Sequence, residues 1–188
     1  YNLTHLMIGS EGTLGLITAI VLKVLPLPNY QTLMLASFPD AVDACKAVSG
    51  IFTAGLLPSV CEFVEPLAFQ LSSELTGIHF EHQLEVGAYL LIETEGFDPK
   101  TPEQHAESIY QVLENHGCIN VLLADSEEKK NIFWRLRRSI GEATKKGNVY
   151  KEEDTVVPRA TLPQLYHGVK EIAQRYQVRT VCYGHAGD

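Results

Sequence analysis

The stretch Gln31-Thr-Leu-Met-Leu-Ala-Ser-Phe38 has the composition of a buried β-strand, and Pro39-Asp40 follows it directly. Asp40 is a preferred residue at a helix N-cap, so the pattern indicates a helix after it. Apolar residues do recur there at helical spacing, at Val42, Cys45, Val48 and Phe52. Gly55 ends this helix and Ser59–Val64 is a second strand. The stretch therefore predicts one strand–helix–strand unit.

A second unit of the same kind follows further along the chain. Val86–Glu95 is a strongly apolar strand, and Thr101-Pro-Glu-Gln104 is a capping box with proline at the first helical position. That helix ends at Gly117, and Cys118–Ala124 is the next strand. Two such units predict an α+β fold, the ferredoxin-like split βαβ sandwich, with an antiparallel sheet and helices on one face.

Further elements flank the two units. Residues 16–24 form an apolar, β-branched strand that Pro26 and Pro28 end, so we take the first 28 residues as an arm. The remaining elements are a short helix from Glu65-Pro66 to about Glu74, a helix capped by Ser126 and ended by Gly147, an extended segment over Val149–Val157, a helix behind the capping box Thr161-Leu-Pro-Gln164, and a last strand over Val178–Tyr183.

Composition restricts the class of protein. The 188 residues are 45% hydrophobic and 20% charged, as in globular proteins, and 15 basic against 23 acidic residues argue against a nucleic-acid partner. The apolar run Leu14–Leu25 is too short to span a bilayer, and the first residues lack a signal peptide. The four cysteines, which lie far apart, are expected to be buried small hydrophobic residues in a reducing cytosol: Cys45, Cys61, Cys118 and Cys182.

The stretch Ile8-Gly-Ser-Glu-Gly-Thr-Leu-Gly-Leu-Ile-Thr18 is rich in glycine. Turns of this kind align backbone N–H groups into concavities that hold anions, phosphates above all. A glycine-rich turn before an edge strand explains the same spacing equally well.

Three side chains are candidates for chemistry. Arg137 lies one helical turn from Trp134 and has the planar fork that holds a carboxylate, although a solvated basic helix face is the alternative. Lys151 begins an acidic run and is either a second cation for the same acid or one member of screened surface pairs. His185 follows the last predicted strand and is either a ligand of a divalent metal, with Asp188 contributing an oxygen, or a polar residue in a terminal turn.

The remaining histidines are expected at the surface. His79 and His82 have a metal-compatible spacing, but they lie in a polar loop without a third ligand.

Several motifs, in this order along the chain, resemble the FAD-linked oxidase family with the vanillyl-alcohol-oxidase-type flavin fold. They are the glycine-rich stretch before a Pro-x-Pro break, Trp134-x-x-Arg137, Tyr150-Lys151, Val156-Val-Pro-Arg159 and Tyr183-Gly-His-Ala-Gly-Asp188. The branch that the chain resembles most is the FAD subunit of glycolate oxidase with the D-lactate dehydrogenases. Several ordered motifs together are more specific than any one of them.

The resemblance implies a domain organisation and a cofactor. Residues 1–28 would be the C-terminal tail of the FAD-binding domain with its linker, and residues 29–188 the substrate or cap domain, truncated at its C-terminus. FAD would be contacted at its diphosphate and adenine side by Gly9, Ser10, Glu11, Gly12, Thr13, Gly15 and Ile17.

The resemblance also implies catalytic roles. Arg137 and Lys151 would hold the substrate carboxylate. His185 would be the first histidine of a Gly-His-x-Gly-Asp-Gly-Asn-x-His motif, which in relatives binds a divalent metal such as zinc or the substrate hydroxyl. A metal there would acidify that hydroxyl while a hydride passes to the flavin. Gly141 stands where the D-2-hydroxyglutarate branch carries a hydroxyl residue, which disfavours that substrate.

The sequence departs from the family pattern because the FAD-binding domain before Tyr1 and the Gly-Asn-x-His after Asp188 are missing. We therefore expect an internal segment of an enzyme that oxidises glycolate or D-lactate to the 2-oxo acid. The expected location of this enzyme is the cytoplasm, either free or attached to the surface of the inner membrane. The isolated segment should be inactive. Further partners that would suit such an enzyme are an iron–sulfur electron-transfer subunit and a second copy of the same chain, in a homodimer. The alternative is a ferredoxin-like binding or regulatory module without chemistry.

Overall fold

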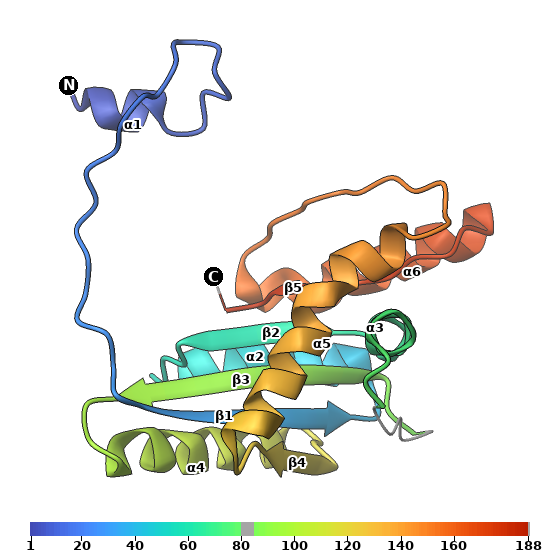
Figure 1. Cartoon of the computed structure of the whole chain (residues 1–188). Helices are drawn as coiled ribbons and strands as arrows, with labels where there is room; N and C mark the ends of the chain where they lie inside the picture. Colours follow the sequence, from blue (N-terminus) through green and yellow to red (C-terminus); the bar gives the residue numbers. More distant parts are fainter. Residues whose placement is uncertain (80–84, 188) are drawn as a thin grey trace.

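The described residues, 1–79 and 85–187 of a computed structural model, form an antiparallel sheet with helices on both faces and an arm that stands apart (Figure 1). The sheet has five strands in the order β4-β1-β3-β2-β5. The strands are β1 (Tyr30–Phe38), β2 (Val60–Val64), β3 (Ala88–Gly96), β4 (Asn120–Leu123) and β5 (Tyr183–His185). The order of the first four is that of the split βαβ sandwich, so this prediction is confirmed.

The helices are α1 (Leu3–Met7), α2 (Ala41–Thr53), α3 (Pro66–Thr76), α4 (Lys100–Asn115), α5 (Glu127–Lys145), the 3-10 turn η1 (Arg159–Thr161) and α6 (Leu162–Tyr176). Among the described helices, none is both long and apolar enough to cross a membrane.

Each face of the sheet is buried under its own pair of helices. In β1, Met34, Ala36 and Phe38 share a core with α2 and α4, whereas Leu33 and Leu35 share a core with α3 and α5. This alternation follows from the two-residue period of a strand. The prediction placed the helices of the two repeated units on one face, where α2 and α4 do lie. The opposite face is covered by α3 and by α5, which crosses the sheet diagonally in Figure 1.

Two strand predictions are wrong. Residues 16–24 are extended and exposed but pair with no strand of the described sheet, because a β-branched run becomes a strand only beside a partner. The last strand begins at Tyr183, not at Val178, and pairs Tyr183 with Val64 and His185 with Glu62. Its edge position leaves β2 between β3 and β5.

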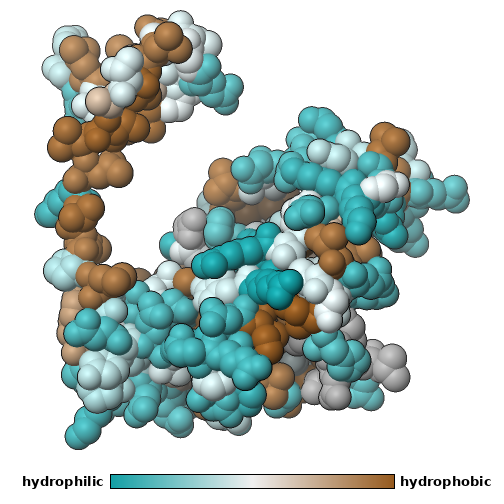
Figure 2. Space-filling view, viewed as in Figure 1, coloured by the Kyte–Doolittle hydropathy of each residue, from teal (hydrophilic) through white to brown (hydrophobic). Residues whose placement is uncertain are grey.

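The arm, residues 1–28, contributes nothing to either core cluster. Figure 2 shows it as a largely hydrophobic segment beside a mostly hydrophilic body. Its exposed apolar side chains include Leu16, Ile20, Val21 and Val24. The predicted assignment of residues 1–28 to another domain stays a prediction.

The cysteines behave largely as small hydrophobic residues. Cys45 and Cys61 are buried, and Cys118 and Cys182 are partly buried. Burial raises the pKa of the Cys45 thiol to about 12, so this thiol is protonated at neutral pH and is a poor nucleophile.

Candidate active site

Glu62 is the centre of the site. It lies in β2 between Cys61 and Phe63, whose side chains pack into the core under α2, so Glu62 projects to the face covered by α5. Its side chain is only 5% exposed. A buried carboxylate is costly unless hydrogen bonds and opposite charge compensate it, so its partners define the chemistry of this face.

The first partner is Arg137 of α5. Its Nε and Nη2 donate to Oε2 of Glu62 at 3.0 and 2.6 Å. The side chain of Arg137 is 14% exposed, and its guanidinium carbon lies 5.5 Å from the centre of the Tyr183 ring. Arg137 therefore does not lie on a solvated basic helix face, the alternative for it. It forms a largely buried, charge-assisted pair with Glu62.

The second partner is His185 of β5. Its Nδ1 lies 2.6 Å from Oε1 of Glu62, and the two residues are register partners in the antiparallel pair of β2 and β5. Directly opposed residues place their side chains on the same face of a sheet, which is why this contact forms. The His185 side chain remains 68% exposed, so one edge of the ring faces solvent while the other contacts Glu62.

Lys151 is not brought to this cluster. Its side chain is 82% exposed and its Nζ pairs with Glu153 at 3.2 Å. It lies in the segment between α5 and η1, which Figure 1 shows as an open arc away from the sheet. The geometry matches the alternative of surface pairs, which are usually worth little.

The glycine-rich turn also lies apart from the cluster. Gly9, Glu11 and Gly12 adopt left-handed backbone angles, with φ of 75°, 49° and 77°, and Thr13 closes the turn by donating its N–H to the Ser10 carbonyl. An added Cβ at Gly9 or Gly12 would meet no atom within 4 Å. The turn thus offers accessible backbone of the kind that binds anions, on the arm rather than on the body.

The described residues hold no metal site. Within residues 1–79 and 85–187 no three His, Cys, Asp or Glu side chains are grouped as ligands, so the zinc expectation at His185 gains no support. His79 is exposed, as predicted, whereas His82 and Asp188 lie outside the described residues.

Two further carboxylates, Glu65 directly after β2 and Glu93 within β3, have distinct partners. Glu65 accepts hydrogen bonds from Tyr166 Oη and the Cys182 N–H, both at 2.7 Å, and pairs with Lys170 at 2.5 Å, so it fastens α6 to the end of β2. Glu93 of β3 accepts from Trp134 Nε1 at 3.4 Å. Burial raises the pKa of the Glu93 carboxyl, against the opposing effect of the Trp134 hydrogen bond.

The sequence prediction missed Glu62. The only local signal is an acidic residue in an otherwise apolar strand, Val60-Cys-Glu-Phe-Val64, where a charge requires a partner. Its two partners are 75 and 123 residues away in sequence, so the strand alone does not identify them.

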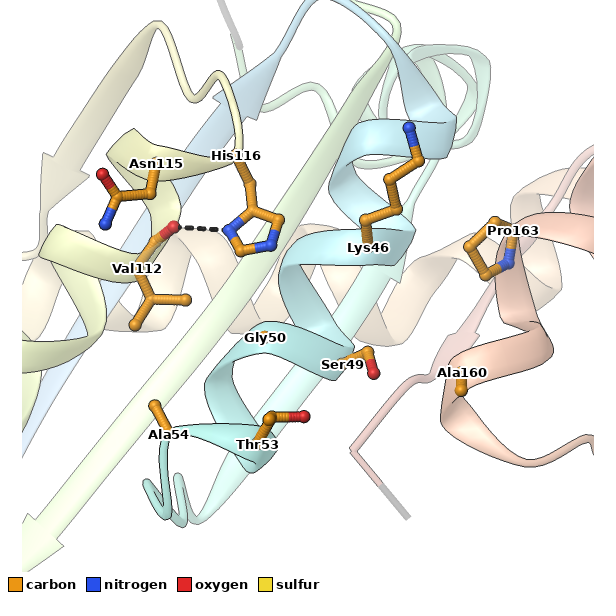
Figure 3. A pocket seen from close by; sticks show the side chains of 10 residues that line it. All are labelled: Lys46, Ser49, Gly50, Thr53, Ala54, Val112, Asn115, His116, Ala160 and Pro163. Atoms are coloured by element: carbon orange, nitrogen blue, oxygen red, sulfur yellow. Dashed lines mark hydrogen bonds between the residues drawn. The ribbon is translucent and has the colours of Figure 1, made fainter.

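A hollow of about 660 Å³ lies on the opposite side of the molecule, between α2, the end of α4 and the start of α6 (Figure 3). There His116 Nδ1 donates to the Val112 carbonyl at 2.8 Å, and Ser49 faces Ala160 across the gap. The sheet separates this hollow from Glu62, so the hollow is not part of the site. The candidate active site is therefore the cluster of Glu62, Arg137 and His185.

Comparison with known proteins identifies the family. The D-lactate dehydrogenases of Anaerostipes hadrus and Archaeoglobus fulgidus are 33% and 30% identical over the whole chain, which covers 41% and 40% of their lengths. The glycolate oxidase subunit GlcD of Escherichia coli K12 is 31% identical over the whole of this chain, which covers 37% of the length of that protein.

A solved structure of alkyldihydroxyacetonephosphate synthase shares the fold, with a TM-score of 0.62 at 24% identity over 94% of this chain and 37% of that one. The family model for the C-terminal domain of FAD linked oxidases matches residues 27–188. The chain therefore belongs to the FAD-linked oxidases and carries their C-terminal domain.

Proposed function

We propose that this chain is the substrate-binding segment of an FAD-dependent dehydrogenase that oxidises a short D-2-hydroxy acid, such as glycolate or D-lactate, to the 2-oxo acid. The observation that carries the proposal is the Arg137–Glu62–His185 cluster, in which a guanidinium and an imidazole share one buried carboxylate. The names of the relatives, D-lactate dehydrogenase and glycolate oxidase subunit, support the substrate class.

Arg137 would bind the substrate carboxylate. A guanidinium has five N–H donors, and the bonds to Glu62 use Nε and Nη2, which leaves Nη1 for a second carboxylate. His185 would accept the proton of the substrate hydroxyl at its exposed edge while the hydrogen on C2 leaves as hydride. FAD, when bound, supplies the hydride acceptor.

The residues of the arm fit such a cofactor. The left-handed positions at Gly9, Glu11 and Gly12 expose backbone N–H groups suited to a diphosphate, and Ser10 adds a hydroxyl, whereas the Thr13 hydroxyl already donates to the Ser10 carbonyl. We assign the cofactor contacts to this turn and the substrate contacts to the body.

The test is kinetic and uses the full-length protein with FAD. Arg137→Lys keeps the charge but loses the planar fork, so KM for glycolate or D-lactate should rise about tenfold, as expected for the loss of roughly 1.5 kcal/mol of charge-assisted hydrogen bonding. The matched control is Arg138→Lys, since Arg138 stacks on Trp134 with its guanidinium carbon 5.0 Å from the ring centre.

Full-length protein that binds no flavin, or that oxidises neither acid in a dye-linked assay, would overturn the proposal. An equal effect of the two arginine variants would exclude Arg137 as the carboxylate ligand. For the isolated segment of 188 residues we expect neither bound FAD nor turnover, and stoichiometric flavin on it would contradict that expectation.

A further inference from the structure

We propose that Glu62 is the positioning residue of this site, because its one carboxylate fixes both the tautomer of His185 and the place of Arg137. The structural half of this proposal stands on the contacts alone. Its consequence for turnover rests on the proposed oxidation of 2-hydroxy acids.

Glu62 is ionised in this arrangement. Arg137 cannot give up its proton in a protein, and both its Nε and Nη2 donate to Oε2. The other oxygen, Oε1, meets Nδ1 of His185 at 2.6 Å. A carboxylate only accepts, so Nδ1 carries the hydrogen and donates it.

This contact determines which nitrogen of His185 can react. In the neutral ring a hydrogen on Nδ1 leaves the lone pair on Nε2, and that edge belongs to the exposed part of the side chain. The lone pair on Nε2 is what a general base needs to accept a hydroxyl proton. Glu62 therefore keeps the ring in the tautomer that is competent as a base.

The backbone around Glu62 holds the arrangement firmly. β2 is paired on both sides, with β3 and β5, and the N–H groups of Ala186 and Gly187 donate to the Cys61 carbonyl at 2.8 and 3.2 Å. A Cβ added at Gly187 would lie 3.0 Å from that of Cys61, so the chain after His185 runs close against β2. These contacts fix the backbone of His185, and the contact between Nδ1 and Oε1 of Glu62 then holds its ring.

The shared carboxylate also brings two substrate-binding groups to adjacent places. Guanidinium and imidazole bind the two oxygens of the same carboxylate, at distances of 2.6 to 3.0 Å. A 2-hydroxy acid presents its carboxylate and its hydroxyl on neighbouring carbons. Glu62 therefore holds side by side the group proposed for the substrate carboxylate and the group proposed for its hydroxyl.

Glu62→Gln is the decisive variant. Its amide has a single oxygen, and the permanent charge of Arg137 takes it, so the NH₂ group faces Nδ1 of His185. Nδ1 must then accept, and the hydrogen moves to Nε2. We expect long-range ¹H–¹⁵N spectra of histidine-labelled full-length protein to show the Nδ1–H tautomer in the wild type and the Nε2–H tautomer in the variant, with kcat about 100-fold lower.

The matched control is Glu65→Gln, a buried carboxylate three residues away whose partners are Tyr166, Lys170 and the Cys182 N–H. It should lower stability and leave the His185 tautomer unchanged. Wild-type protein with the Nε2–H tautomer overturns the proposal without any variant, as does a folded Glu62→Gln protein that keeps Nδ1–H and full kcat. If the tautomer of His185 switches in Glu62→Gln but the wild-type protein does not oxidise 2-hydroxy acids, the positioning role of Glu62 is supported and only the proposed function is overturned.

Discussion

Two glycines inside helices have opposite surroundings and lead to opposite predictions. A Cβ at Gly50 of α2 would lie 2.5 Å from Cε1 of His116, whose ring is fixed by its bond to the Val112 carbonyl (Figure 3). A Cβ at Gly168 of α6 would meet no atom within 4 Å. Replacing a helical glycine by alanine gains about 1 kcal/mol, whereas overpacking costs roughly 1–3 kcal/mol.

We therefore expect Gly168→Ala to raise the free energy of unfolding in urea by about 1 kcal/mol and Gly50→Ala to lower it by a similar amount. In a His116→Ala background the sign for Gly50→Ala should reverse. Equal stabilisation by both single substitutions would show that the His116 ring moves aside freely.

Residue identity predicted the candidate site only in part. Arg137 and His185 stand in motifs that the family resemblance identifies, whereas Glu62 is recognisable only once the register of β2 and β5 is known. Lys151 also stands in such a motif, but its segment lies away from the sheet, and its side chain is 82% exposed.

At the level of elements, the helix N-termini show that neighbouring polar side chains compete to cap the same helix. Asp40 and Ser126 cap α2 and α5 as predicted, accepting from Val42 N at 2.6 Å and Lys129 N at 3.2 Å. Thr161 is the N-cap residue of α6, as predicted, but neither Thr101 nor Thr161 forms the predicted capping box. α4 begins earlier, at Lys100, because Asp98 accepts from the Lys100 and Thr101 N–H groups, and the Thr161 hydroxyl donates backward to Pro158.

The cap of α4 predicts a pH dependence. Hydrogen bonds from the Thr101 hydroxyl and its N–H lower the pKa of Asp98 from its usual 3.8. Folding thus favours the carboxylate, so its stabilisation is complete above the unfolded pKa and is lost as pH falls through the lower folded pKa. The stability difference between wild type and Asp98→Asn should shrink on acidification, measured by urea unfolding at several pH values.

Thr161→Ala is the control for this series, because neither side chain titrates and its effect should not vary with pH. A gap between wild type and Asp98→Asn that stays constant down to about pH 2 would contradict a role for the charge of Asp98.

At the scale of the whole molecule, the two strand–helix–strand units were enough to predict the order of four strands, because each unit carries its own apolar periodicity. The arm shows the limit of this reasoning. Residues 16–24 have the residues of a strand, but a strand also needs a neighbour, and the body provides none for them in the described structure.

Removing the arm should therefore leave the body intact. Both core clusters begin at Leu33 or later, so a chain that starts at Pro28 should unfold in urea within about 0.5 kcal/mol of the full segment. The exposed apolar side chains of the arm, such as Val21 and Leu22, should make the longer chain self-associate, as light scattering would detect. A large loss of stability without the arm would mean that these side chains pack on the body in solution. Equal scattering by both chains would mean that association, if present, arises from the body itself.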